Sequence, residues 1–162
     1  MADTLSDQEA LERAFRMLAR RPHSEREIQR KLKEKGASGA GIARVLDRLR
    51  ELGYVDDAAF ARGWAKGRAG GRLWGDRRIA AGLREKGIPA ELIRTTLSEI
   101  REDVDEGEAL RRCLERKLRG RDPAALELRE KRRLAQSLAG RGFPLDLIVR
   151  ELNAGEGRSV KG

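Results

Sequence analysis

The sequence predicts an all-α protein of three tandem three-helix repeats in an elongated array, and two observations carry this prediction. Apolar residues recur four positions apart on both sides of three glycines, Gly36, Gly87 and Gly142. That pattern is typical of two amphipathic helices joined by a short turn. The glycines are 51 and 55 residues apart, so the same unit is written three times along the chain.

Each of these glycines is predicted to lie just past the second helix of its repeat. Such a position often takes a positive φ, which glycine adopts without strain. Two residues later come Ser38, Pro89 and Pro144, which suit the start of a third helix. We therefore expect Gly87 to tolerate substitution less well than Gly82, which falls inside a predicted helix.

The first repeat is predicted to cover residues 1–55. Ser6 and Glu9 form a capping-box pattern that opens a helix to about Arg20. Ser24 and Glu27 repeat that pattern and open a second helix, which ends at Lys35. A third amphipathic helix follows over about residues 39–52.

The second repeat is predicted over 56–101. Either Asp56 or Asp57 is expected to cap its first helix, which continues through two helix-weakening glycines, Gly63 and Gly67, as far as Gly70. The second helix is expected to start at Trp74 and Gly75, and the third at Pro89.

The third repeat is predicted over 102–155 and is the most divergent copy. Asp122 and Pro123 are expected to open one long second helix that runs to Ala139. A short last helix is expected over 144–153, and residues 156–162 have the composition of a disordered polar tail.

Charge and composition indicate a binding protein with anionic partners. Thirty-six Lys and Arg against twenty-seven Asp and Glu give a net charge of +9, which favours association with polyanions. The excess lies in two stretches, 62–86 and 111–133. A single cysteine excludes an intramolecular disulfide and suits a reducing compartment. Because the chain also lacks a long apolar segment and a signal-peptide pattern, we expect a cytoplasmic protein that does not enter a membrane.

Residues that could carry chemistry are few, and each has a simpler explanation. His23 precedes a helix cap and is expected in a capping or surface role. Cys113 falls on an apolar helix face, where it would act as a small buried hydrophobe. Asp56 and Asp57 suit a helix N-terminus better than a metal site. We therefore predict no catalytic residue, no metal site and no cofactor, and hence no enzyme.

Arginines recur at one position of the repeat and are the candidate binding residues. Arg26, Arg77 and Arg132 each precede their glycine by ten residues and project away from the apolar face. Either this is a solvated helix face or it is a surface that meets a polyanion or an acidic partner. Together with their basic neighbours, the candidates for partner or nucleic-acid binding are Arg26, Arg62, Lys66, Arg77, Arg78, Arg84 and Arg132.

The middle repeat resembles that of the RecX family of bacterial regulators. The similarity lies in Asp56-Asp57 with Ala58–Arg62, in Trp74-Gly75, and in Leu83–Ile88. It implies three tandem three-helix repeats that dock in the groove of a RecA recombinase filament on single-stranded DNA. Suppression of recombinase, ATPase and coprotease activities in DNA repair and the SOS response would follow, without catalysis. We expect a monomer.

Two other functions remain open from the sequence. Paired helices also suit a DNA-binding transcriptional regulator, although the helix after each glycine carries few residues that read bases. A helical-repeat scaffold is the third alternative, and it would leave the positive charge unexplained. If single-stranded DNA is contacted directly, we expect electrostatic binding, because aromatic residues are too few for a base-stacking platform.

Overall fold

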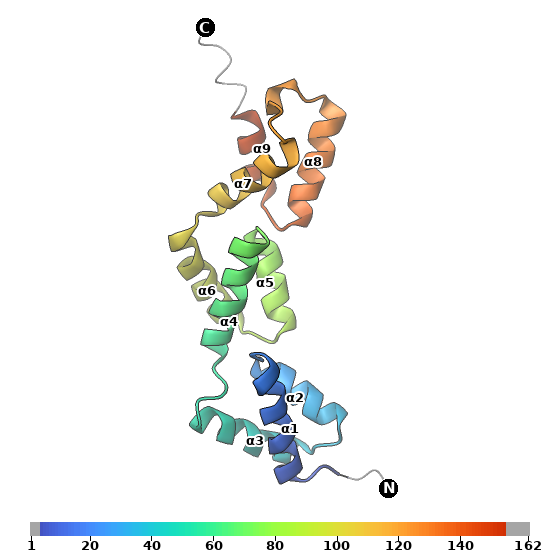
Figure 1. Ribbon diagram of the computed structural model, residues 1–162, viewed down its shortest axis with the longest axis vertical. Helices are drawn as coiled ribbons and strands as arrows, with labels where there is room; N and C mark the ends of the chain where they lie inside the picture. Colours follow the sequence, from blue (N-terminus) through green and yellow to red (C-terminus); the bar gives the residue numbers. More distant parts are fainter. Residues whose placement is uncertain (1–3, 155–162) are drawn as a thin grey trace. The chain divides into compact units, whose positions relative to one another are not determined.

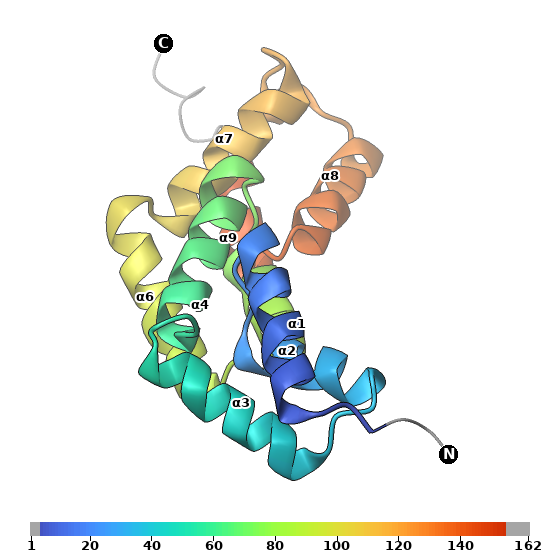
Figure 2. The same ribbon diagram turned by 60° about the horizontal axis from the view of Figure 1, so that its bottom comes forward.

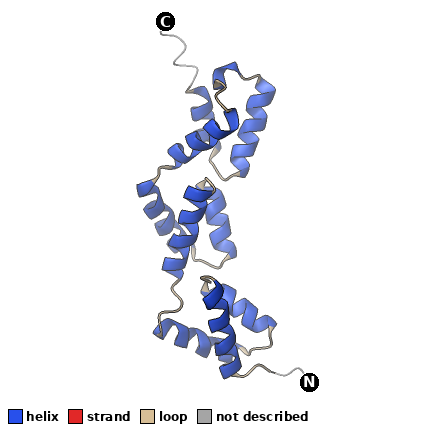
Figure 3. Cartoon of the chain, in the orientation of Figure 1, coloured by secondary structure: helices blue, strands red, loops and turns tan. Residues whose placement is uncertain are grey.

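The computed structural model describes residues 4–154. Within these residues it contains nine α-helices and no strand beyond one isolated bridge between Leu5 and Ala37 (Figures 1 and 3). The helices follow one another in three sets of three. The predicted all-α class and the three tandem three-helix repeats are therefore confirmed, while the expected tail lies outside the described residues.

The helices of each repeat have the following bounds. The first repeat contains α1 (Asp7–Arg20), α2 (Glu25–Glu34) and α3 (Gly39–Glu51). The second contains α4 (Asp57–Lys66), α5 (Asp76–Glu85) and α6 (Ala90–Asp103), with a π-helical turn, η1 (Gly67–Gly71), after α4. The third contains α7 (Glu106–Leu118), α8 (Leu128–Gly140) and α9 (Leu145–Asn153), with a 3-10 turn, η2 (Pro123–Ala125), before α8.

By packing, the described chain forms two compact units whose boundary falls inside the second repeat. The first unit comprises the chain up to Gly63 together with Leu83–Ile93. The second comprises Trp64–Gly82 together with the chain from Arg94 onward. Each unit therefore combines one terminal repeat with part of the middle repeat.

The first repeat packs α1 against both α2 and α3 (Figure 2). The capping box predicted at Ser6 and Glu9 is present and begins α1. Ala10 and Ala14 are buried on α1, where their small side chains allow Ile28 and Leu49 to pack closely in the same core. The cap at the start of α1 and the apolar stripe along it thus both match the helix that the sequence predicts.

The third repeat has its own core, formed by α7, α8 and α9. Leu110, Leu138, Phe143 and Ile148 are fully buried there. Cys113 is 4% exposed in the same core, which confirms its expected role as a small buried hydrophobe.

The single long helix predicted from Asp122 to Ala139 is wrong. Asp122 caps the 3-10 turn by accepting the Ala124 N–H at 2.9 Å. The backbone then becomes extended at Leu126, a buried residue, and α8 starts afresh behind a capping box of Glu127 and Glu130. Burial of Leu126 and the second cap outweigh the continuous helical pattern.

The first helix of the second repeat also ends earlier than predicted. Regular α-helix stops at Lys66, and the chain widens into η1 instead of continuing to Gly70. Three glycines in η1 weaken α-helical geometry and permit the wider turn. The segment closes with a hydrogen bond of 3.0 Å from the Trp74 N–H to the Arg68 carbonyl.

The three repeat glycines have the positive φ predicted for them, at 91°, 78° and 97° for Gly36, Gly87 and Gly142. The sequence did not reveal that Gly82 faces a packed side chain, and its comparison with Gly87 stays a prediction. A Cβ atom at Gly82 would lie 2.2 Å from the Trp64 ring. Packing of an indole on this helical glycine could not be foreseen from local sequence.

We predict that Gly87→Ala lowers the free energy of unfolding by about 1–2 kcal/mol, because alanine is strained at positive φ. The new Cβ would also lie 2.1 Å from Arg26 Cδ, so that side chain must move. Gly63→Ala is the matched control: the site is helical, with no atom within 4 Å of an added Cβ. This control should gain roughly 1 kcal/mol. Urea denaturation followed by circular dichroism measures both, and a neutral Gly87→Ala would contradict the role of the turn.

Candidate functional site

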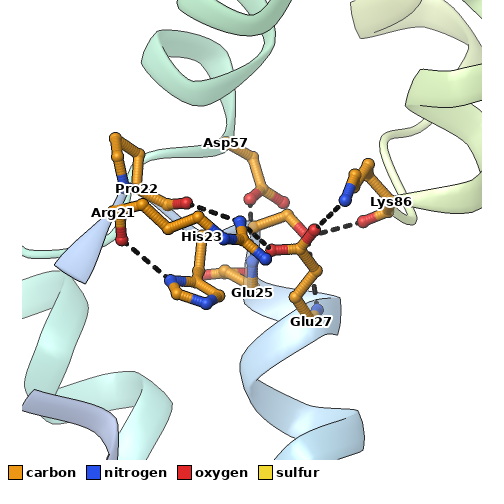
Figure 4. A network of polar contacts seen from close by, with 8 residues as sticks. Arg21, Pro22, His23, Glu25, Glu27, Asp57 and Lys86 are labelled. Atoms are coloured by element: carbon orange, nitrogen blue, oxygen red, sulfur yellow. Dashed lines mark hydrogen bonds and ion pairs between the residues drawn. The ribbon is translucent and has the colours of Figure 1, made fainter. Parts of the chain in front are cut away.

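The first and second repeats meet through the N-terminus of α2 (Figure 4). The Ser24 hydroxyl accepts the Glu27 N–H at 3.2 Å and donates to the Lys86 carbonyl at 2.7 Å. The Glu25 N–H donates to the Asp57 carboxylate at 3.0 Å. One hydroxyl therefore caps α2 and also binds it to the turn that ends α5. We call this set of contacts the first joint.

Glu27 is the buried charge of the first joint, and its side chain is 6% exposed. Its carboxylate pairs with Lys86 and, at 3.1 Å, with Arg21. The second capping box predicted from the sequence is thus only half formed, because this side chain turns to the two cations rather than back to Ser24. Burial opposes ionisation, but the bonds from Lys86 and Arg21 outweigh it and lower the pKa of Glu27.

The same contacts recur as a second joint between the middle and last repeats. The Gly75 N–H donates to the Arg141 carbonyl at 2.8 Å, and the Asp76 N–H donates to the Glu106 carboxylate at 2.9 Å. Gly75 takes the register position of Ser24. A Cβ there would lie 2.3 Å from the backbone of Gly142, so a backbone N–H replaces the serine hydroxyl at this closer approach.

In each joint, an arginine at the same position of the repeat binds an acidic residue at the start of the middle helix. Arg50 binds Glu25 in the first joint. Arg101 binds Asp76 at 2.7 Å in the second and also donates to the Trp74 carbonyl at 3.0 Å. These two arginines stabilise the joints and are committed to neighbouring acidic groups.

The acidic residues that accept the helix N–H groups have structural roles. Burial raises the pKa of both Asp57 and Glu106, although each accepts a backbone hydrogen bond. Of the two aspartates expected at this cap, Asp56 caps α4 by accepting the Ala59 N–H at 3.1 Å. Asp56 and Asp57 therefore serve different backbone donors.

The third repeat lacks the donor that a further joint would need. In register, α8 begins three residues earlier than α2 and α5. Lys131, at the position of Glu25, consequently donates its N–H to the Glu127 carbonyl at 2.9 Å. The first turn of α8 satisfies this group internally, which suits the last repeat of an array.

His23 precedes the first joint and is buried, with 5% exposure. The expectation of a surface role is therefore wrong. Its Nδ1–H donates to the Arg21 carbonyl at 2.8 Å. This burial is a tertiary effect that a single histidine in the sequence does not reveal.

We predict that Glu27→Gln lowers the free energy of unfolding by about 2 kcal/mol at neutral pH, because it leaves Lys86 without its anion. The pKa of Glu27 is depressed on folding, so its contribution is complete above the ordinary value of 4.5 and is lost as the pH falls through the folded pKa. The difference between wild type and variant should thus shrink on acidification. Denaturant melts over a pH series measure it.

Glu34→Gln is the control for that substitution. Glu34 faces Arg30 at 3.9 Å on an exposed helix surface, where an ion pair contributes little. Equal losses in the two variants, or a Glu27→Gln effect that is independent of pH, would contradict the assignment of a buried ion pair.

All seven sequence-predicted binding residues are exposed. Arg26, Arg62 and Arg84 fall in the first unit, whereas Lys66, Arg77, Arg78 and Arg132 fall in the second. Arg26 and Arg84 both line a groove of about 1100 Å³, but acidic and basic side chains are equally numerous in that lining. This groove therefore offers a polyanion no net attraction.

The recurring arginine position has a structural explanation that the sequence did not suggest. The aliphatic stem of Arg26 lies over Gly87 in the first joint. In the second joint, the Arg77 N–H donates to the Gly142 carbonyl at 3.1 Å. Two of the three recurring arginines, Arg26 and Arg77, thus take part in a joint, while the exposed guanidinium groups of all three remain candidates for binding.

A concentrated basic site lies in the second unit around two indole rings. Trp64 and Trp74 meet edge to face with ring centroids 6.0 Å apart. Arg68 Cζ lies 4.7 Å from the Trp64 centroid and 5.4 Å from that of Trp74. Arg78 Cζ lies 4.0 Å from the Trp74 centroid and Arg72 Cζ lies 5.9 Å from it. We call these five residues the tryptophan–arginine cluster.

Positive charge in the cluster is not neutralised by described residues. Among residues 4–154, no ion pair involves Arg68, Arg72 or Arg78, and Arg141 adds a further guanidinium by donating to the Arg72 carbonyl. A guanidinium held over an indole keeps its N–H edge available for a carboxylate or phosphate. The cluster thus concentrates positive charge at one place in the second unit.

Backbone irregularities set the geometry of the cluster. Arg68 lies in η1, and Leu73 adopts a φ of 52° while its side chain is 2% exposed. A π-helical turn and a strained non-glycine residue often mark functional sites. The sequence analysis selected Arg78 but missed Arg68, Arg72 and the role of the two tryptophans. The signal that could have indicated this cluster is the alternation of tryptophan and arginine along this stretch of sequence.

The repeats and the cluster define a helical-repeat protein with a concentrated basic surface. Three RecX domain families match it in order: the first three-helix domain over residues 10–49, the second over 56–97 and the third over 104–152. The chain belongs to the RecX family.

Curated relatives are similar over most of their length. The regulatory protein RecX of Mycobacterium sp. (strain JLS) is 38% identical over 148 residues, which cover 88% of this chain and 80% of the relative. The regulatory protein RecX of Chlorobaculum tepidum is 37% identical over 139 residues, covering 86% of this chain and 83% of the relative. The matches span all three repeats.

Solved structures agree with the fold. A crystal structure of regulatory protein RecX has a TM-score of 0.74 at 27% identity and covers 87% of this chain and 70% of its own. RecX from Lactobacillus salivarius has a TM-score of 0.76 at 21% identity, covers 91% of this chain and 97% of its own, and supports the fold alone. Among the described helices, none is long and apolar enough to cross a membrane.

Proposed function

We propose that this chain binds the RecA recombinase filament on single-stranded DNA and inhibits its recombinase, ATPase and coprotease activities. Membership of the RecX family supports the choice of partner. The observation that carries the proposed contact surface is the uncompensated charge of Arg68, Arg72 and Arg78 over the two indoles. A nucleoprotein filament presents phosphates and carboxylates, and guanidinium groups bind both in a bidentate manner.

Contact through the cluster is made by guanidinium edges rather than by base stacking. Arg68 and Arg78 lie over the indole rings, so those ring faces are occupied by the protein itself. Any direct contact with single-stranded DNA is therefore electrostatic, weakly dependent on sequence and sensitive to salt. Arg77 and Lys66 neighbour the cluster in the sequence and are included in the proposed surface.

A role as a sequence-specific DNA regulator receives little support from the helices that follow the glycine turns. In α9 the only arginine is Arg150. In α6 one of the two arginines, Arg101, is bound to Asp76 and to the Trp74 carbonyl. Base readout in the major groove needs several exposed basic or amide side chains on one helix.

The proposal predicts that Arg68→Gln combined with Arg78→Gln weakens inhibition of the RecA DNA-dependent ATPase. We expect the concentration for half-inhibition to rise about tenfold or more, since two charge-assisted contacts are lost. The control is Arg116→Gln with Lys117→Gln, which removes the same charge from exposed positions of α7. That control should change half-inhibition by less than about threefold.

Circular dichroism and co-sedimentation with RecA on single-stranded DNA complete the assay. A single Arg78→Lys variant keeps the charge without the planar fork and should inhibit at an intermediate level. If the folded double variant inhibits like the parent, the cluster is not the contact surface. If the control loses as much, net charge alone explains the effect, and if the parent itself does not bind RecA filaments, the proposed function is wrong.

A further inference from the structure

A second basic feature lies in the first repeat, within the first unit. A cavity of about 680 Å³ opens between α1 and α2 and the turn that joins them. One acidic side chain, Glu34, contributes to its lining, against six basic ones: Arg13, Arg16, Arg20, Arg21, Lys31 and Lys35. The half-buried Met17 supplies apolar surface in the same lining, and Leu32 lies behind it in the core at 1% exposure. The cavity therefore combines an apolar wall with a strongly positive rim.

Four of these cations form no side-chain hydrogen bond or ion pair with a described residue. Arg21 is engaged by Glu27, and Arg16 donates to the Glu12 carbonyl at 3.4 Å. Glu34 lines the cavity, but its carboxylate faces Arg30, which lies outside the lining. Within residues 4–154, no side-chain hydrogen bond or ion pair involves the remaining cations, which are Arg13, Arg20, Lys31 and Lys35. Like charges around one cavity repel each other, and an anion bound there relieves the repulsion.

His23 forms part of the cavity wall and reports on its charge. Its Nδ1–H is committed to the Arg21 carbonyl, so Nε2 carries no proton in the neutral ring. Burial lowers the pKa of His23, and the charges of Arg21 and Lys31 lower it further, whereas Glu27 opposes them. These three residues are the charged groups that act on the ring, and an added anion would raise its pKa.

We propose that this cavity binds a free nucleoside polyphosphate, with its phosphates among the cations of the rim and its nucleoside against Met17. The volume falls in the usual range for small-molecule sites, roughly 300–1,000 Å³. Lysine and arginine together are the side chains that bind phosphate groups. An inorganic anion would leave the apolar wall unused, and a long strand would need a groove more extended than this cavity.

The test titrates the full-length chain with ATP, without recombinase or DNA, by calorimetry and by NMR. Because His23 is the only histidine in the chain, its ring resonances give a site-specific probe. We expect bound ATP to raise the pKa of His23. Arg13→Gln with Lys31→Gln should weaken ATP binding about tenfold or more, since it removes two charge-assisted contacts.

The control for this test removes two cations of α2 that lie outside the cavity lining. Arg30→Gln with Lys33→Gln carries the same change in net charge, and both positions are exposed. We expect less than about threefold loss of ATP affinity in this variant. Circular dichroism checks that both variants fold, and tripolyphosphate should bind the parent more weakly than ATP does.

Several results would overturn the proposal. They are an unchanged His23 pKa, an equal loss in the control variant, or equal affinities for ATP and tripolyphosphate. Tighter binding of an oligothymidylate, abolished by the Arg13 and Lys31 substitutions, would assign the cavity to a nucleic-acid strand and not to a free nucleotide. Since RecA is absent from the assay, its outcome is separate from that of the proposed filament binding.

Discussion

The repeats are joined where the N-terminus of a middle helix meets the glycine turn of the next repeat. At the first joint, Ser24 binds the Lys86 carbonyl beside Gly87, and at the second, Gly75 binds the Arg141 carbonyl beside Gly142. Side chains at either turn glycine would strike the neighbouring repeat. The close approach of the two repeats gives hydrogen-bond partners to N–H groups at helix ends that would otherwise need water. It also places the buried carboxylate of Glu27 beside Lys86 in the neighbouring turn.

The joints also divide the arginines of this basic chain into two groups. Arg50 and Arg101 brace neighbouring acidic groups and hold the repeats together. Arg68, Arg72 and Arg78 form no ion pair with a described residue and stack near indoles instead. A net charge of +9 therefore does not describe one diffuse surface. It includes structural cations that are already neutralised and a cluster that remains available for an anionic partner.

Features that depend on local rules could be predicted from the sequence. The glycine turns, the caps at Ser6 and Asp56 and the burial of Cys113 follow from backbone sterics and periodicity. The π-helical turn η1 and the packing of Trp64 on Gly82 depend on tertiary contacts, so the sequence pattern did not reveal them. For the same reason the cluster was only partly foreseen, through Arg78, because its other arginines are positioned by an irregular turn.

Amide hydrogen exchange of this chain, free and bound to RecA filaments on single-stranded DNA, would test most directly whether the tryptophan–arginine cluster is the contact surface. Peptides that cover residues 64–78 should gain protection on binding, because the cluster becomes covered and η1 loses its freedom to open. Peptides from α7, which also carries several basic residues but lies outside the cluster, should change little. Protection confined to α7 or to the first repeat, with 64–78 unchanged in a bound complex, would contradict this assignment.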